Sequence, residues 1–135
     1  MLVAVASALA ACGGPKGLTT TPPPVAQPGV ADTDVVFDLL MAGDEGAATK
    51  RLKAIRKRDP MNATALLLSD SIGRDPTELL GPNSYPYAVR PGDTIVGLAQ
   101  RFLGNRLKAY QLLRYNGLKA PAVLAPGQTL RIPQA

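Results

Sequence analysis

The sequence contains no histidine, no tryptophan and a single cysteine, Cys12. A Ser-His-Asp triad, a Cys–His dyad and the usual zinc ligand sets all need residues that are missing here. One cysteine cannot close a disulfide within the chain, so the cysteine count leaves the redox compartment open. The acidic residues fall mostly at helix caps and surface positions, without the paired carboxylates of a glycoside hydrolase. We therefore expect a non-catalytic protein that needs neither cofactor nor metal.

Aromatic residues make up only 4% of the 135 residues, which predicts a core of aliphatic side chains. Glycine and proline are frequent, with thirteen of each. So many glycine and proline residues are typical of linkers and turns, and they argue against long helices or strands. The length allows one ordinary domain or two very small ones.

The N-terminal stretch is uniformly apolar or small over residues 2–11. It is far shorter than the ~20 residues of a membrane-spanning helix, and it matches the hydrophobic region of a secretory signal. The sequence Leu9-Ala10-Ala11-Cys12 resembles the bacterial lipoprotein box, in which the cysteine thiolate accepts a diacylglycerol and the peptide is cut before it. The alternatives are an ordinary secretory signal and a buried apolar strand. We expect a lipoprotein signal peptide at residues 1–11 and lipidation at Cys12.

Residues 12–31 form a stretch rich in Gly, Pro and Thr with almost no large apolar side chain. Such a composition cannot bury enough surface to offset the entropy of ordering. We expect a disordered, semi-rigid tether that follows the lipidated cysteine.

A helical segment is predicted for residues 32–81, where apolar residues recur at helical spacing. Asp32, Thr33 or Asp34 would cap the first helix, and Asp59-Pro60 and Asp75-Pro76 are each typical of a helix start. Three helices and a short turn ending at Gly81 are expected. Their apolar faces are Val36, Leu39 and Leu40, then Ala48, Leu52 and Ile55, then Met61, Ala65, Leu68 and Ile72.

The stretch AGDEGAATKRLKAIRKRDPMNATAL within this segment resembles a tetratricopeptide unit, of which it covers about one and a half repeats. Packing against the neighbouring domain is favoured over a peptide-binding groove. Six positive charges fall between Lys50 and Arg58. A nucleic-acid or acidic-lipid patch is one interpretation. A solvated helix face is favoured, because Leu52 and Ile55 take the inner face.

Two nearly identical pentapeptides occur in the C-terminal part, PGDTI at 91–95 and PGQTL at 126–130. In both, Pro-Gly predicts a tight turn. The first follows a short strand at 87–89 and precedes a helix, whereas the second precedes a strand that contains Leu130 and Ile132. The two pentapeptides are therefore corners of one folded unit and not a tandem repeat.

Two helices are predicted between these corners. The inner face of the first carries Ile95, Leu98, Ala99 and Phe102, and Leu103-Gly104-Asn105 ends it. The second runs from about Leu107 to Tyr115, with Tyr110 and Leu113 pointing inward, and Asn116-Gly117 stops it.

The order strand, helix, helix, strand, with the two pentapeptides at its turns, closely resembles the LysM domain over residues 85–133. The resemblance implies two helices on one side of a two-stranded antiparallel sheet, and hence an α+β fold with a small helical stack before it. The matching positions are Tyr87, Val89, Gly92-Asp93-Thr94-Ile95, Leu98-Ala99, Tyr110, Asn116-Gly117-Leu118, Leu124, Gly127-Gln128, Leu130 and Ile132-Pro133.

LysM domains usually bind a β-1,4-linked glycan bearing N-acetylglucosamine, which in bacteria means peptidoglycan. The resemblance implies a shallow groove between the strand-to-helix loop and the loop after the second helix. Each residue also has a purely structural interpretation as a helix cap, a loop residue or part of the core. The implied glycan-binding residues are Gly92, Asp93, Thr94 and Ile95 on one side and Asn116, Gly117 and Leu118 on the other.

The charge distribution agrees with this interpretation. Residues 90–135 hold seven Lys or Arg against one Asp, whereas residues 32–80 hold seven against nine acidic residues. A basic module gains on-rate toward an anionic cell wall. The aromatic stacking platform of single-strand binders is missing, so no nucleic-acid partner is expected.

These observations predict a lipid-anchored peptidoglycan-binding protein of the cell envelope. Its membrane contact is the lipid on Cys12, and it faces the periplasm. Gly13 after the cysteine favours the outer membrane if the host has one. The alternative is an accessory scaffold, in which the helical segment binds a protein partner and recruits a cell-wall hydrolase or a secretion component to peptidoglycan.

Overall fold

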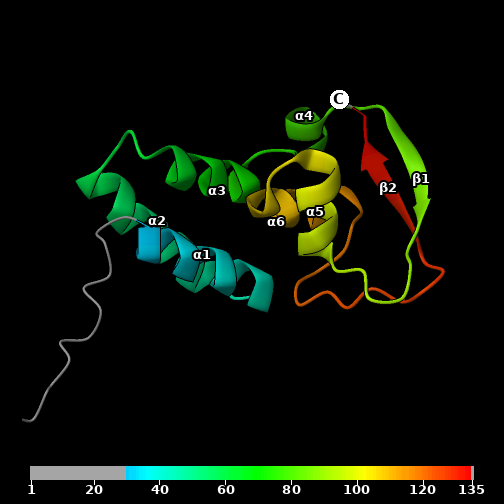
Figure 1. The fold of residues 1–135 in the computed structure, drawn as a ribbon. Coiled ribbons are helices and arrows are strands. Elements are labelled where there is room, and N and C mark those ends of the chain that lie inside the picture. Colours follow the sequence, from blue (N-terminus) through cyan, green and yellow to red (C-terminus); the bar gives the residue numbers. More distant parts are fainter. Residues whose placement is uncertain (1–29, 135) are drawn as a thin grey trace, which may run out of the picture.

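The computed structural model describes residues 30–134. The predicted signal peptide and Cys12 lie outside the described residues, as does the predicted tether up to residue 29. Helices α1–α3 lie at one end of the molecule and the two strands at the other, with α5 and α6 between them (Figure 1). The predicted α+β fold is confirmed. The elements are α1 Val30–Ala42, α2 Glu45–Arg58, α3 Ala63–Gly73, α4 Pro76–Leu80, β1 Ser84–Ala88, α5 Ile95–Leu103, the 3-10 helix η1 Arg106–Lys108, α6 Ala109–Tyr115 and β2 Thr129–Pro133.

The first three helices form a helical stack (α1–α3) with their apolar faces together. In α2, Ala48, Leu52 and Ile55 are buried, as their spacing predicted. The six basic residues between Lys50 and Arg58 are exposed, which is the expected solvated face. None of the helices within residues 30–134 has the length and apolarity needed to cross a membrane.

Two helix starts differ from the prediction. Helix α1 begins at Val30, so Asp32 and Asp34 lie inside it instead of capping it. They form ion pairs with Arg58 at 2.5 Å and with Arg106 at 3.1 Å. Their charges therefore join α1 to other parts of the fold.

Helix α3 begins later than Asp59-Pro60 predicted. The N-cap is Asn62, whose Oδ1 accepts a hydrogen bond from the Ala65 backbone N–H at 2.9 Å. Asp59 instead closes α2, because its N–H donates to the Ile55 carbonyl. The delayed start leaves Met61 outside the helix and 83% exposed, so its predicted place in the core was wrong.

Strands β1 and β2 form one antiparallel sheet, in which Tyr85 lies opposite Ile132 and Tyr87 opposite Leu130. Strand β1 starts at Ser84, earlier than the strand predicted at residues 87–89. Hydrogen bonds from Gln134 to Asn83 and from Val89 to Gln128 show that odd-numbered residues turn their backbone groups toward β2. The nitrogen of Pro86 therefore faces away from β2, so the missing N–H costs no ladder bond.

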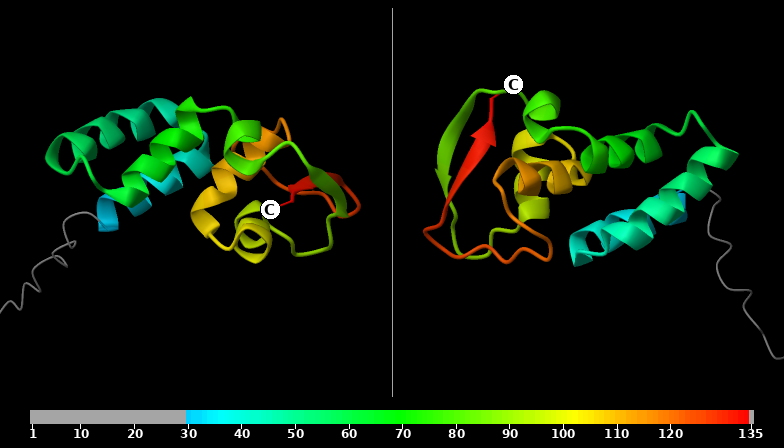
Figure 2. Two further views of the ribbon diagram at one scale, coloured as in Figure 1. Left: turned by 90° about the horizontal axis from the view of Figure 1, so that it is seen from above. Right: turned by 180° about the vertical axis from the view of Figure 1, so that it is seen from behind.

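Helices α5 and α6 cover one side of this sheet (Figures 1 and 2). The predicted second helix is divided into η1 and α6. Tyr110 and Leu113 point inward as predicted, with 7% and 1% of their surface exposed. They belong to one apolar core that also includes Leu98, Leu130 and Ile132.

The same core continues into the helical stack. The buried Gln111 of α6 donates from Nε2 to the Ser71 hydroxyl at 2.9 Å. Arg114 donates to the backbone carbonyls of Ser71 and Arg74 at 2.6 and 2.8 Å. These contacts support the expected packing role, since the stack meets residues 84–134, the C-terminal unit, through one buried and two less buried hydrogen bonds as well as apolar contact.

Candidate functional site

The first predicted site segment begins with a tight turn at Arg90–Asp93, the first turn. The Asp93 N–H donates to the Arg90 carbonyl at 3.1 Å. Pro91 supplies the fixed φ of the second position, and Gly92 has a φ of +87° at the third. This combination is a type II turn, which needs glycine or asparagine where φ is positive.

The side-chain carboxylate of Asp93 also stabilises the first turn. Its Oδ2 accepts from the Arg90 N–H at 2.8 Å and from the Tyr87 hydroxyl at 2.7 Å. The hydrogen bond from the Arg90 N–H, and then the one from the Tyr87 hydroxyl, hold the pKa of Asp93 below its usual value. The bond between Tyr87 and Asp93 also raises the pKa of Tyr87. Within residues 30–134, Oδ1 carries no hydrogen bond, so one carboxylate oxygen is available to a ligand.

The remaining residues of this segment have different exposures. Thr94 is the N-cap of α5, and its Oγ1 accepts from the Gly97 N–H at 3.0 Å. It is exposed, as is Gly92. Ile95 is only 3% exposed and belongs to the core. The structure therefore places Ile95 where its structural interpretation predicted, beneath the surface that a sugar would contact.

The second predicted segment ends α6. The Gly117 N–H donates to the Arg114 carbonyl and the Leu118 N–H to the Leu113 carbonyl, both at 3.0 Å. With a φ of +66° at Gly117, this is a Schellman cap. Gly117 is exposed and Leu118 is half-buried.

The side chain of Asn116 joins the end of α6 to β2 through hydrogen bonds. Its Oδ1 accepts from the Arg131 N–H at 2.7 Å, and its Nδ2 donates to the Arg131 carbonyl at 3.0 Å. The second Nδ2 hydrogen serves the Leu112 carbonyl at 3.0 Å. Both amide hydrogens are in use, so Asn116 has no donor left for a sugar.

The connection from α6 to β2 runs past the loop before α5 at one end of the C-terminal unit (Figures 1 and 2). No hydrogen bond within the described residues joins 92–95 to 116–118. Leu118 lines a hollow of about 290 Å³ between the helical stack and the C-terminal unit, together with Gly43, Glu45 and Tyr110. In that hollow, burial and the bond to Glu45 raise the pKa of Tyr110 to about 12.

A second turn at Ala125–Gln128 repeats the design of the first turn. The Gln128 N–H donates to the Ala125 carbonyl at 3.0 Å, and the Gln128 Oε1 accepts from the Ala125 N–H at 3.1 Å. Gly127 has a φ of +86°. Val89 bonds to both Gly127 and Gln128 at 2.8 Å, which holds this turn beside the strand that leads into the first. The repeated pentapeptide predicted this turn, which lies outside the predicted glycan-binding segments.

Comparison with known proteins agrees with the fold of the C-terminal unit, because residues 87–133 match the LysM domain. The C-terminal unit contains a LysM domain. Over 47 residues, the chain is 36% identical to an uncharacterized protein of Deinococcus radiodurans. That match covers 35% of this chain and 19% of the relative, so the chain corresponds to a small part of that protein. No solved structure matches the chain.

A LysM domain is a binding module and implies recognition of glycans that contain N-acetylglucosamine, such as peptidoglycan or chitin. The exposed groups of the two segments suit such a ligand. Gly92 is exposed, and a Cβ added to it would meet no atom within 4 Å. Open space of this kind lets a sugar ring approach the backbone closely.

Proposed function

We propose that the protein is a non-catalytic, lipid-anchored peptidoglycan-binding protein. The observation that carries the proposal is the LysM domain at residues 87–133. Peptidoglycan is a bacterial glycan that contains N-acetylglucosamine, and the basic charge of this part of the chain suits an anionic wall.

In this proposal the glycan lies between the first turn and the loop after α6. Gly92 offers exposed backbone, Thr94 a hydroxyl and Asp93 its free Oδ1. Gly117 and Leu118 form the other side, with Leu118 against an apolar sugar face. Ile95 and Asn116 support these residues from behind, through the core contact and the bonds to Arg131.

Binding to purified peptidoglycan sacculi tests the glycan site. Gly92→Val should abolish most of the binding, because a branched side chain would occupy the open space above the turn. Gly104→Val is the matched control, since Gly104 also has a positive φ and no atom within 4 Å of an added Cβ. Gly104 caps the opposite end of α5.

Circular dichroism must show that both variants are folded under the binding conditions. Raised salt should weaken wild-type binding only modestly, because neutral sugar contacts dominate and charge mainly steers the encounter. Equal binding by the two variants, together with collapse of wild-type binding in salt, would assign the ligand to the basic surface and reject the groove.

The membrane anchor is the second part of the proposal, and it rests on Leu9-Ala10-Ala11-Cys12. Several buried acyl chains would anchor the protein stably, whereas one chain binds only marginally. The protein would then face the periplasm, on the outer membrane if the host has one. Cys12→Ser should release the protein from membranes in a flotation gradient, and a variant that still floats would contradict the lipid anchor.

A further inference from the structure

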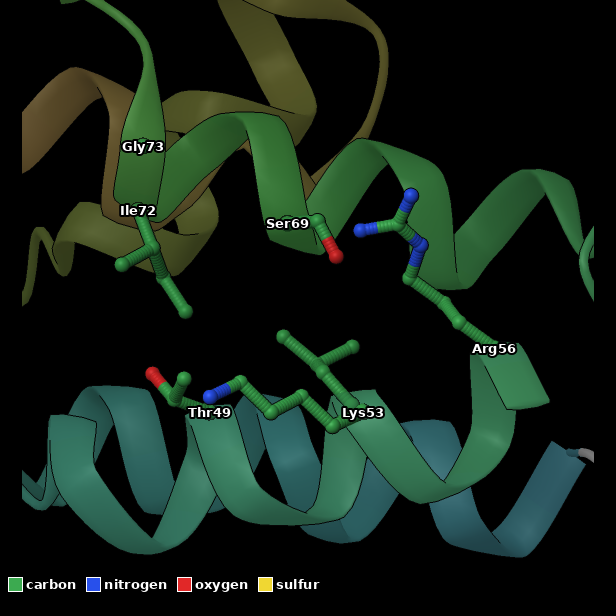
Figure 3. A pocket seen from close by; sticks show the side chains of 7 residues that line it. Thr49, Lys53, Arg56, Ser69, Ile72 and Gly73 are labelled. Carbon is green, nitrogen blue, oxygen red and sulfur yellow. The ribbon is translucent and has the colours of Figure 1, made fainter.

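A second concave surface lies on the helical stack, between α2 and α3. The basic hollow, as we call it, has a volume of about 220 Å³. Figure 3 shows side chains of both helices extending into the space between them. It is lined by Thr49, Leu52, Lys53 and Arg56 of α2 and by Ser69, Ile72 and Gly73 of α3.

The spacing of these residues explains the hollow. On each helix they recur at intervals of three and four, so each set occupies one face. The floor is apolar, because Leu52 is buried and Ile72 half-buried. Gly73 contributes no side chain, and a Cβ added there would meet nothing within 4 Å. The missing side chain at Gly73 therefore leaves part of the hollow open.

Two basic side chains line the basic hollow beside its apolar residues and have no anionic partner among the described residues. Lys53 and Arg56 are exposed, and neither forms an ion pair or a side-chain hydrogen bond with any described residue. The ion pairs of residues 30–134 use Arg58, Arg74 and Arg106 instead. An occupant with both an aliphatic group and anionic groups would complement the hollow.

The volume of the basic hollow and its lining residues exclude several classes of ligand. A drug-sized ligand or cofactor needs roughly 300–1,000 Å³, which is more than the hollow provides. None of the seven lining residues is aromatic, so neither a base nor a sugar ring finds a stacking partner. A short peptide segment offers an aliphatic side chain between carboxylates at this scale.

We propose that the basic hollow binds a short acidic peptide segment of a protein partner. An aliphatic side chain of that segment rests on Leu52 and Ile72. Carboxylates beside it pair with Lys53 and Arg56, and the hydroxyls of Thr49 and Ser69 offer further hydrogen bonds. This site goes beyond the proposed glycan binding and lies on a different part of the fold.

Fluorescence anisotropy with the full chain tests this site. The probe is a fluorescein-labelled hexapeptide, Asp-Glu-Leu-Glu-Asp-Leu, and its control has Asn and Gln in place of the acids. The acidic peptide should bind at least about tenfold more tightly than the control, a difference of about 1.4 kcal/mol. Failure of the acidic peptide to bind would overturn the proposal.

Matched variants separate the hollow from general basic charge. Lys53→Glu/Arg56→Glu should weaken binding of the acidic peptide about tenfold or more. Lys50→Glu/Lys57→Glu changes the net charge equally on the same exposed helix but outside the hollow, and it should keep binding within about threefold. Equal loss in the two double variants would show that diffuse charge holds the peptide, against the proposal.

Gly73→Leu fills the hollow without changing charge. The backbone of Gly73 is not among the positive-φ glycines, so the substitution carries no strain of that kind. We expect about tenfold weaker peptide binding with an unchanged melting temperature. Unchanged binding would overturn the proposal.

Two other ligand classes serve as competing probes. A single-stranded oligonucleotide or vesicles of anionic phospholipid that bind more tightly than the peptide, and are unaffected by Gly73→Leu, would reassign the surface. The glycan proposal can fail separately, because Gly92→Val should leave peptide binding intact.

Discussion

The first turn at Arg90–Asp93 and the second turn at Ala125–Gln128 are built alike but lead to different structures. Each has proline second, glycine third with a φ of +87° or +86°, and a fourth side chain that accepts from the first backbone N–H. After the first comes the helix α5, and after the second comes the strand β2. The turn is set locally by proline and glycine, whereas the exit is set by the spacing of the apolar residues that follow.

The turns differ in their fourth residue. Asp93 is charged and receives a second donor, the Tyr87 hydroxyl, whereas Gln128 is neutral and serves the Ala125 N–H. Only the first turn therefore couples its geometry to protonation. The first turn also contains Gly92 and Asp93, two of the five residues proposed to contact the glycan, so comparing the two turns separates what a turn needs to fold from what the ligand needs.

The largest effects should come from the two glycines. Gly92→Val and Gly127→Val should each lower the free energy of unfolding by about 1–3 kcal/mol, the cost of forcing a positive φ on a branched residue. The losses should be similar, since an added Cβ meets no atom within 4 Å at either position. Urea denaturation measures both. A difference above about 1 kcal/mol would show that the turns are not energetically equivalent.

Protonation should affect only the first turn. Because the folded-state pKa of Asp93 lies below its usual 3.8, its hydrogen bonds stabilise the fold above that pH and are lost as pH falls through the lowered pKa. Asp93→Asn should therefore flatten the acid side of the stability profile, measured by thermal melts from pH 7 down to about pH 2. An unchanged acid profile would contradict this coupling.

The control for that experiment is Gln128→Ala in the second turn. Loss of its bond to Ala125 should cost about 0.5–1.5 kcal/mol, the usual net value of a hydrogen bond. The cost should be the same at every pH, because no ionisable group is removed. A pH-dependent loss at Gln128 would show that titration elsewhere produces the acid profile.

The smallest effects should come from the prolines. Pro91→Ala and Pro126→Ala should each destabilise the fold by about 0.4–1 kcal/mol, mainly because the unfolded chain gains freedom. Both should leave sacculus binding unchanged, in contrast to Gly92→Val. Thermal melts and the sacculus assay check this, and loss of binding in Pro91→Ala alone would place the proline in the ligand contact.

Features set by local sequence could be predicted. The cap at Asp75 and the buried face of α5 follow from residues within one or two turns of helix. Asn62 was missed because Asp59-Pro60 offered an equally plausible start nearby. The start of β1 was missed because Pro86 is tolerable only where its nitrogen faces away from β2, and that depends on pairing with residues more than forty positions away.

The predicted site was harder to resolve for the same reason. The sequence can name Gly92, Asp93 and Asn116, but it cannot say which of their polar atoms the fold already uses. Asn116 is occupied by Arg131, fifteen positions along the chain. Asp93 keeps one free oxygen because both of its donors reach the other one.

The bond of Asn116 to Arg131 has a further consequence for how the sheet meets other chains. An exposed strand edge is a template on which another strand can add or aggregate. At the centre of β2, the Asn116 carboxamide occupies the outward N–H and carbonyl of Arg131. At the centre of β1, Pro86 has no N–H to offer. Both edges of this small sheet thus lack a free N–H at their midpoints, which disfavours edge-to-edge association of the domain.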